Sequence, residues 1–60
     1  MKLWIARNKY GMLKLWFNKP VKQNFQFYSN DGFFILDENL FPEVTFENSP
    51  REVEVELKLI

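Results

Sequence analysis

The fold of this chain is decided by residues 2–17, KLWIARNKYGMLKLWF. Apolar and polar side chains alternate in two runs, as in Leu3 and Ile5 against Lys2 and Trp4, which is the period of a half-buried β-strand. Between the runs, Gly11 can take the positive φ that closes a type I turn followed by a bulge. Residues 2–17 are therefore predicted to form a β-hairpin.

The register of this hairpin depends on the length of its loop. A loop of four residues would place Ile5 opposite Lys14 and mix apolar with charged positions on one face. A loop formed by residues 9–11 instead gives cross-strand pairs of matching character, namely Asn8 with Met12, Ile5 with Leu15 and Trp4 with Trp16. We therefore predict the shorter loop.

A second hairpin is predicted around the segment Ser29–Gly32. The Asp-Gly pair there lies between two apolar runs, residues 25–28 and 33–36, and this arrangement is a strong hairpin signal. Residues 18–23 are predicted to be a connection without a strand, since Pro20 removes a ladder donor. Both runs are apolar on both faces, so we expect them to be covered on two sides or to lie in an interface.

The last third of the chain is predicted to return to the sheet. Residues 37–42 are typical of a single helical turn, with Leu40 and Phe41 plugging one end of the core, and residues 44–46 of a short strand. The clearest alternation in the chain follows, with one set of side chains facing inward and the other outward: Val53, Val55, Leu57 and Leu59 against Glu52, Glu54, Glu56 and Lys58.

These elements predict an all-β protein with one short helical turn and a single domain, residues 1–60. About five strands would form one antiparallel sheet, strongly curled or closed into a small SH3-like barrel. The hydrophobic share of 47% argues against disorder. There is no cysteine, so neither disulfides nor thiolate zinc sites are expected. No apolar run approaches the length of a membrane span or a signal peptide, and we expect a cytoplasmic protein without a membrane partner.

The formal charge of zero hides two opposed blocks. Six of the eight basic residues lie at or before position 22, and all eight acidic residues lie after it. On the first hairpin the outward face would carry Lys2, Trp4, Lys14 and Trp16. Such a face can bind single-stranded nucleic acid, because bases stack on rings while cations attract phosphates. The other interpretation is structural: tryptophans as cross-strand pairs, and lysines paired with Glu54 and Glu56 if the last strand lies beside the first.

The acidic block has two interpretations as well. Glu52, Glu54 and Glu56 project from one side of the last strand, about 7 Å apart, which is too far for one tight metal site. They would either form a solvated edge that pairs with lysines of the same sheet, or meet a basic partner and inhibit it by mimicking phosphate. The second interpretation requires three glutamates free of internal cations.

No residue pattern in the chain predicts catalysis. Without histidine or cysteine, the serines and threonine lack the usual general base. Two isolated glycines make no phosphate-cradling loop, so no catalytic, metal or cofactor site is expected. We therefore expect a non-enzymatic interaction or structural module whose partner is a second copy of itself or another protein, with nucleic acid as the alternative partner.

The C-terminal half also resembles a known group of sequences. The segment LFPEVTFENSP, residues 40–50, running into VEVELKL, residues 53–59, is similar to the closing pattern of short uncharacterised proteins of gut Bacteroidetes, and WIARN, residues 4–8, with a glycine turn and Leu-x-Leu is similar to their N-termini. The resemblance implies a domain of unknown function in a bacterial cytoplasm. It implies no activity, cofactor or catalytic residue.

Overall fold

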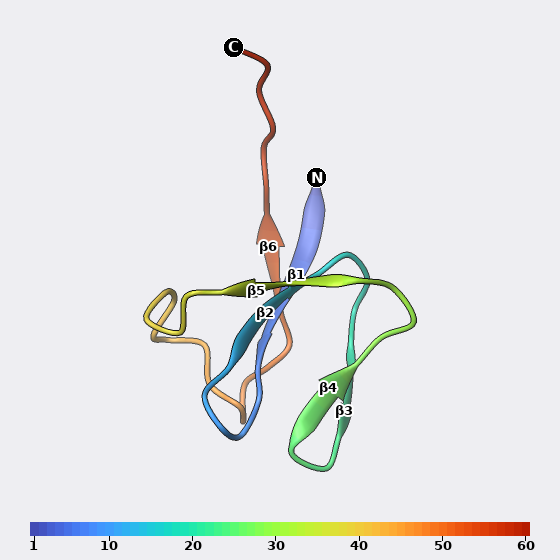
Figure 1. Cartoon of the computed structure of the whole chain (residues 1–60), viewed down its shortest axis with the longest axis vertical. Helices are drawn as coiled ribbons and strands as arrows, with labels where there is room; N and C mark the ends of the chain where they lie inside the picture. The colour runs from blue at the N-terminus through green and yellow to red at the C-terminus, as the bar shows by residue number, and fades with distance from the viewer.

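The computed structural model describes all residues, 1–60, as six β-strands without a helix (Figure 1). The strands are β1 (Lys2–Arg7), β2 (Leu13–Trp16), β3 (Val21–Gln23), β4 (Gln26–Tyr28), β5 (Phe33–Leu36) and β6 (Arg51–Glu54). Four of them form an antiparallel sheet in the order β5-β2-β1-β6, while β3 and β4 form a separate two-stranded sheet. The all-β prediction is confirmed as a small curled sheet, and the alternative of a closed barrel is wrong.

The first hairpin, β1 with β2, has the predicted loop and register. Trp4 pairs with Trp16 and Ile5 with Leu15. The Asn8 N–H donates to the Met12 carbonyl over 3.0 Å, and Gly11 adopts a φ of 94°. The side chain of Asn8 fills the loop, because its Oδ1 accepts the N–H groups of both Tyr10 and Met12. The loop is therefore closed by a buried asparagine as well as by a glycine.

The prediction of the second hairpin is wrong about which strands pair. β4 pairs with β3, which lies in the segment predicted to be a connection, and β5 pairs with β2. The turn between β3 and β4 consists of Asn24 and Phe25, and Asn24 takes a φ of 54°, a conformation that asparagine tolerates better than most residues. Gly32 does not take a positive φ, so the Asp-Gly pair lies in a connection between the two sheets.

Residues 37–50 form a loop in place of the predicted helical turn and short strand. Asp37 does cap the segment, since its Oδ1 accepts the Asn39 N–H over 2.8 Å. Leu40 and Phe41 are 47% and 43% exposed, so the prediction that they plug the core is wrong. Val44 takes that position and is 3% exposed. Val44 and Phe46 are the loop side chains that pack against the core, and polar contacts also hold the loop.

Arg7 supplies most of those polar contacts. Its guanidinium donates five hydrogen bonds to backbone carbonyls, over 2.6–3.2 Å. One acceptor is Gly11, and the other four lie in the loop: Glu38, Leu40, Phe41 and Val44. A guanidinium has five N–H donors in a fixed planar fork, so all of them are used. One side chain on β1 thus determines where a loop more than thirty residues away lies.

The last strand is shorter than its sequence pattern. β6 lies beside β1, with Glu54 opposite Lys2 and Val53 opposite Leu3, and it ends at Glu54, opposite the first residue of β1. A final backbone bond joins the Val55 N–H to the Met1 carbonyl. The prediction that Leu57 and Leu59 face inward is wrong, since they are 77% and 103% exposed.

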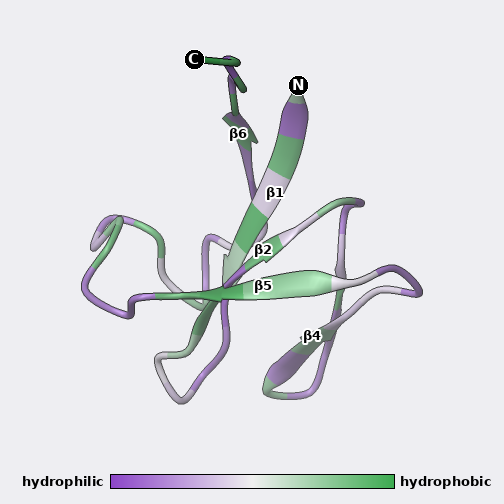
Figure 2. Ribbon diagram, turned by 45° about the horizontal axis from the view of Figure 1, so that its top comes forward, coloured by the Kyte–Doolittle hydropathy of each residue, from purple (hydrophilic) through white to green (hydrophobic).

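Apolar side chains bury both faces of the four-stranded sheet. On one face, Ile5 and Leu13 pack against Val44 of the loop. On the other face, Ala6 and Trp16 pack against Phe27 of β4, so the small sheet acts as a cover for the large one. Figure 2 shows apolar and polar bands alternating along β1, and a β5 that is apolar along its length. The core is therefore two thin layers with the sheet between them.

Candidate functional site

The structure brings together the four side chains of the predicted basic and aromatic face, but it does not expose them together. Trp4 and Trp16 are cross-strand partners. Trp16 is only 3% exposed, because Phe27 covers it and Phe33 lies 4.9 Å away, centroid to centroid. Trp4 is half-buried. A base can stack only on an open ring face, and Trp16 offers none.

Three lysines, Lys14 of this face together with Lys19 and Lys22, lie over aromatic rings of the same chain. The Lys14 ammonium is 4.3 Å from the centroid of the Phe33 ring, and that of Lys19 is 5.3 Å from a Trp4 ring. Lys22 lies over Phe46 at 4.3 Å and also donates to its carbonyl. Cations at these distances are attracted by the ring quadrupole. The aromatic and basic groups therefore stabilise one another within the fold.

The three acidic side chains at positions 52, 54 and 56 each lie beside a cation of the same chain. Glu52 pairs with Lys2 at 3.8 Å, Glu54 with the N-terminal ammonium at 3.1 Å, and Glu56 with Lys58 at 3.7 Å. Lys14 has no acidic partner. All three pairs are exposed, so each contributes little to stability. The glutamates are thus not free of internal cations, and no three acidic side chains converge as they would around a metal ion.

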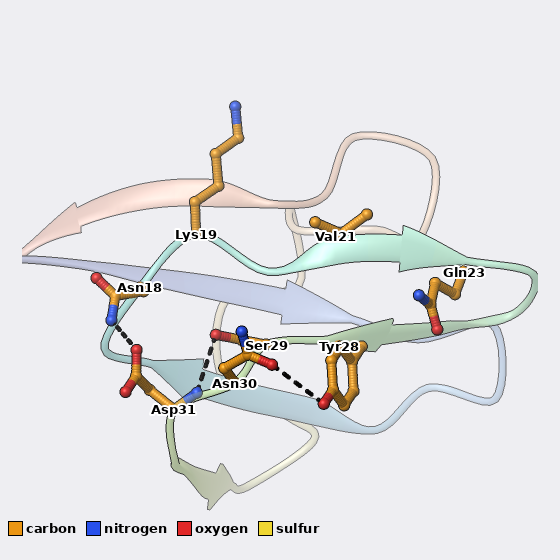
Figure 3. A pocket seen from close by; sticks show the side chains of 8 residues that line it. All are labelled: Asn18, Lys19, Val21, Gln23, Tyr28, Ser29, Asn30 and Asp31. Atoms are coloured by element: carbon orange, nitrogen blue, oxygen red, sulfur yellow. Dashed lines mark hydrogen bonds between the residues drawn. The ribbon is translucent and has the colours of Figure 1, made fainter.

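One shallow, open depression lies beside the two-stranded sheet, with a volume of about 340 Å³ (Figure 3). Its polar groups bond mainly to one another: Asn18 to Asp31, the Asp31 N–H to Ser29, and the Tyr28 hydroxyl to Asn30. Figure 3 shows Lys19 directed away from Asp31. The Asp31 carboxylate accepts from Asn18, and no hydrogen bond joins it to the Ser29 hydroxyl, so we assign no chemistry to the depression.

The most exposed apolar strand is β5, which is one edge of the four-stranded sheet. Phe33, Phe34 and Ile35 are 43%, 59% and 67% exposed, although Phe34 makes an edge-to-face contact with Phe17 at 5.6 Å. The outer side of β5 has no backbone or side-chain hydrogen bond. The sequence signal for this surface was the excess of apolar residues at 33–36, but the mistaken hairpin paired that segment with residues 25–28.

A second unpaired apolar segment follows β6. Residues 56–60 form no backbone hydrogen bond, and Leu57, Leu59 and Ile60 are 77%, 103% and 118% exposed. In Figure 1 this segment extends away from the sheet, past the N-terminus. We call residues 56–60 the C-terminal tail.

Comparisons with family models, curated proteins and solved structures found no match. The resemblance to proteins of gut Bacteroidetes therefore stays a prediction. The structure contains no helix that is long and apolar enough to cross a membrane.

Proposed function

We propose that this chain is a non-enzymatic interaction module that self-associates through the open edge of β5. The observation that carries the proposal is the contrast between the two edges of one sheet. β6 has the sequence Arg-Glu-Val-Glu, and β5 has Phe-Phe-Ile-Leu. Proteins protect edge strands with charge, proline or a cover. β6 has that protection and β5 lacks it.

The occupant of this edge that we propose is a second copy of the chain. An uncovered apolar edge promotes association, and closed symmetric dimers are the commonest outcome for a single kind of chain. The small size of the domain adds to this tendency, since only ten of its sixty residues are buried and a chain this short gains from burial between copies.

Two other functions inferred from the sequence have less support. Nucleic-acid binding needs tryptophan faces that the fold covers with Phe27 and lysines. Inhibition by the acidic strand needs glutamates without internal cations, and each of the three has one. The absence of histidine and cysteine supports a role without catalysis. The absence of cysteine also fits the reducing cytoplasm in which we propose that the module acts.

Analytical ultracentrifugation of the full chain, through the micromolar range, tests the proposal. We expect a concentration-dependent dimer. Ile35→Lys should make the chain monomeric without changing its fold, because Ile35 is 67% exposed and its charge would lie on the edge.

Val21→Lys is the matched control, since Val21 is also a β-branched strand residue, 62% exposed, but lies in the small sheet. It should leave the dimer intact. A wild-type chain that stays monomeric throughout the range would overturn the proposal, as would equal effects of the two substitutions.

A further inference from the structure

We propose that the strand that covers β5 is the C-terminal tail of the second copy. This inference rests on the proposed function and names the segment that occupies its site. The tail has the composition of a strand, since Leu57 and Leu59 alternate with Glu56 and Lys58. It continues the alternation of β6 but has no neighbour, because the sheet has no strand beside it.

The tail cannot reach β5 of its own chain. β5 and β6 are opposite edges of the sheet, with β2 and β1 between them, which separates them by three strand spacings, or about 14 Å. The tail also continues along the direction of β6 and away from the sheet (Figure 1). Pairing within one chain would require β6 to leave β1. Pairing between copies requires no change in either sheet.

Pairing of two β5 edges with each other would leave much of the exposed apolar surface uncovered. It would cover Phe33, Phe34 and Ile35, while Leu57, Leu59 and Ile60 would stay in water. When a tail lies beside β5, apolar side chains of both sets contact one another across the new pair of strands.

Because the tail alternates leucine with charged residues, its register decides which face of β5 lies beside the leucines. Phe34 and Leu36 lie on the same sheet face as Leu13 and Leu15, their register partners. In the register that we propose, Leu57 and Leu59 extend this apolar face, and a shift of one residue would move them to the other face. Glu56 and Lys58 then lie on that other face, which carries Lys14 together with Phe33 and Ile35. The backbone groups of the tail would complete the ladder, as in other cases of β-strand addition.

Paired serine substitutions test this arrangement. Leu57→Ser with Leu59→Ser should weaken dimerisation about 100-fold or more, because two leucines per tail no longer become buried. Glu56→Ser with Lys58→Ser is the control on the same strand, and it should change the dissociation constant by less than about threefold because surface charges contribute little. Neither pair should alter the circular dichroism of the chain, because all four side chains are exposed.

Disulfide trapping gives a second readout, and the chain has no cysteine to interfere with it. The Ile35→Cys variant is mixed with the Lys58→Cys variant under mild oxidation. In a separate mixture it is combined with the Glu56→Cys variant. We expect mixed disulfides between copies, since Ile35 and these two positions lie on one face in the proposed register.

The possible outcomes separate the two proposals. If the leucine variant still dimerises, or if Ile35→Cys forms disulfides only between its own copies, the proposed role of the tail is wrong. Self-association through β5 would then remain supported. A wild-type chain that is monomeric overturns both. Mixed disulfides together with selective loss of the dimer in the leucine variant support both.

Discussion

At the scale of single residues, Arg7 has the most consequential side chain in this fold. A charged residue in a half-buried position normally pairs with a carboxylate. Arg7 instead bonds five carbonyl oxygens, and its backbone N–H donates to Ser49 Oγ over 3.0 Å. Ser49 in turn donates to the Thr45 carbonyl. These bonds attach the loop of residues 37–50 to β1, in addition to the packing of Val44 against Ile5.

We predict that Arg7→Lys lowers the free energy of unfolding by about 2–3 kcal/mol. Lysine keeps the charge but has three donors at one point, so it cannot reach carbonyls spread around a planar fork. Urea unfolding at one fixed protein concentration measures the change, because binding between copies shifts apparent stability. Arg51→Lys is the control, since Arg51 is exposed on β6, and it should alter stability by less than about 0.5 kcal/mol. Similar losses in the two variants would contradict this account of Arg7.

At the scale of elements, two predicted turns and one that was not predicted differ in how much of their geometry is local. The loop of the first hairpin contains a glycine at positive φ, which the sequence predicted, and an asparagine whose side chain fills the loop, which it did not. The β3–β4 turn uses Asn24 at positive φ without a glycine, so its signal was weak. The Asp31-Gly32 pair had the strongest signal and is not a hairpin turn.

The two glycines make this difference measurable. Gly11→Ala should lower the free energy of unfolding by about 1 kcal/mol, because an alanine at a φ of 94° is strained. Gly32→Ala is the matched control. Its added Cβ would likewise have no neighbour within 4 Å, and Gly32 is outside the positive-φ region, so stability should stay the same or rise by about 0.5 kcal/mol through the unfolded state. Thermal unfolding of both variants checks the pair, and a loss at Gly32 as large as that at Gly11 would refute it.

At the scale of the whole molecule, the small sheet serves to cover the large one. Phe27 is 7% exposed and packs on Trp16 and Ala6, while its ring makes an edge-to-face contact with Phe46 at 6.0 Å. A further bond joins the Lys9 N–H to the Phe25 carbonyl, so the loops of the two hairpins are also in contact. The packing of two hairpins thus decides whether Trp16 is part of the core or of a surface.

We predict that Phe27→Leu shifts tryptophan emission to longer wavelength and lowers the free energy of unfolding by about 1–2 kcal/mol, because the smaller side chain leaves Trp16 incompletely covered. Steady-state fluorescence with acrylamide quenching measures the exposure. Tyr28→Leu changes the neighbouring residue, which is 54% exposed, and should leave the emission as in the wild type. An unchanged emission in the Phe27 variant would show that Trp16 is buried by other contacts.

Features that depend on neighbours along the chain could be predicted from the residues alone. The alternation of residues 2–17 and the glycine at position 11 were sufficient for the first hairpin, its loop and its register, because a tight loop fixes which residues face one another. The all-β class followed from the same periodicity. The predicted candidate residues Lys2, Trp4, Lys14 and Trp16 were correctly placed on one face of that hairpin.

The strand partners beyond that hairpin, and the exposure of each face, depend on how the whole chain packs. Residues 33–36 are apolar on both sides and fit beside either β2 or β4, so the choice depends on which arrangement buries more of the whole chain. The burial of Trp16 and the unprotected edge of β5 both follow from that choice. The periodicity of a segment indicates which side chains lie on each side of a strand. It does not indicate which segment of the chain, or of another copy, covers either side.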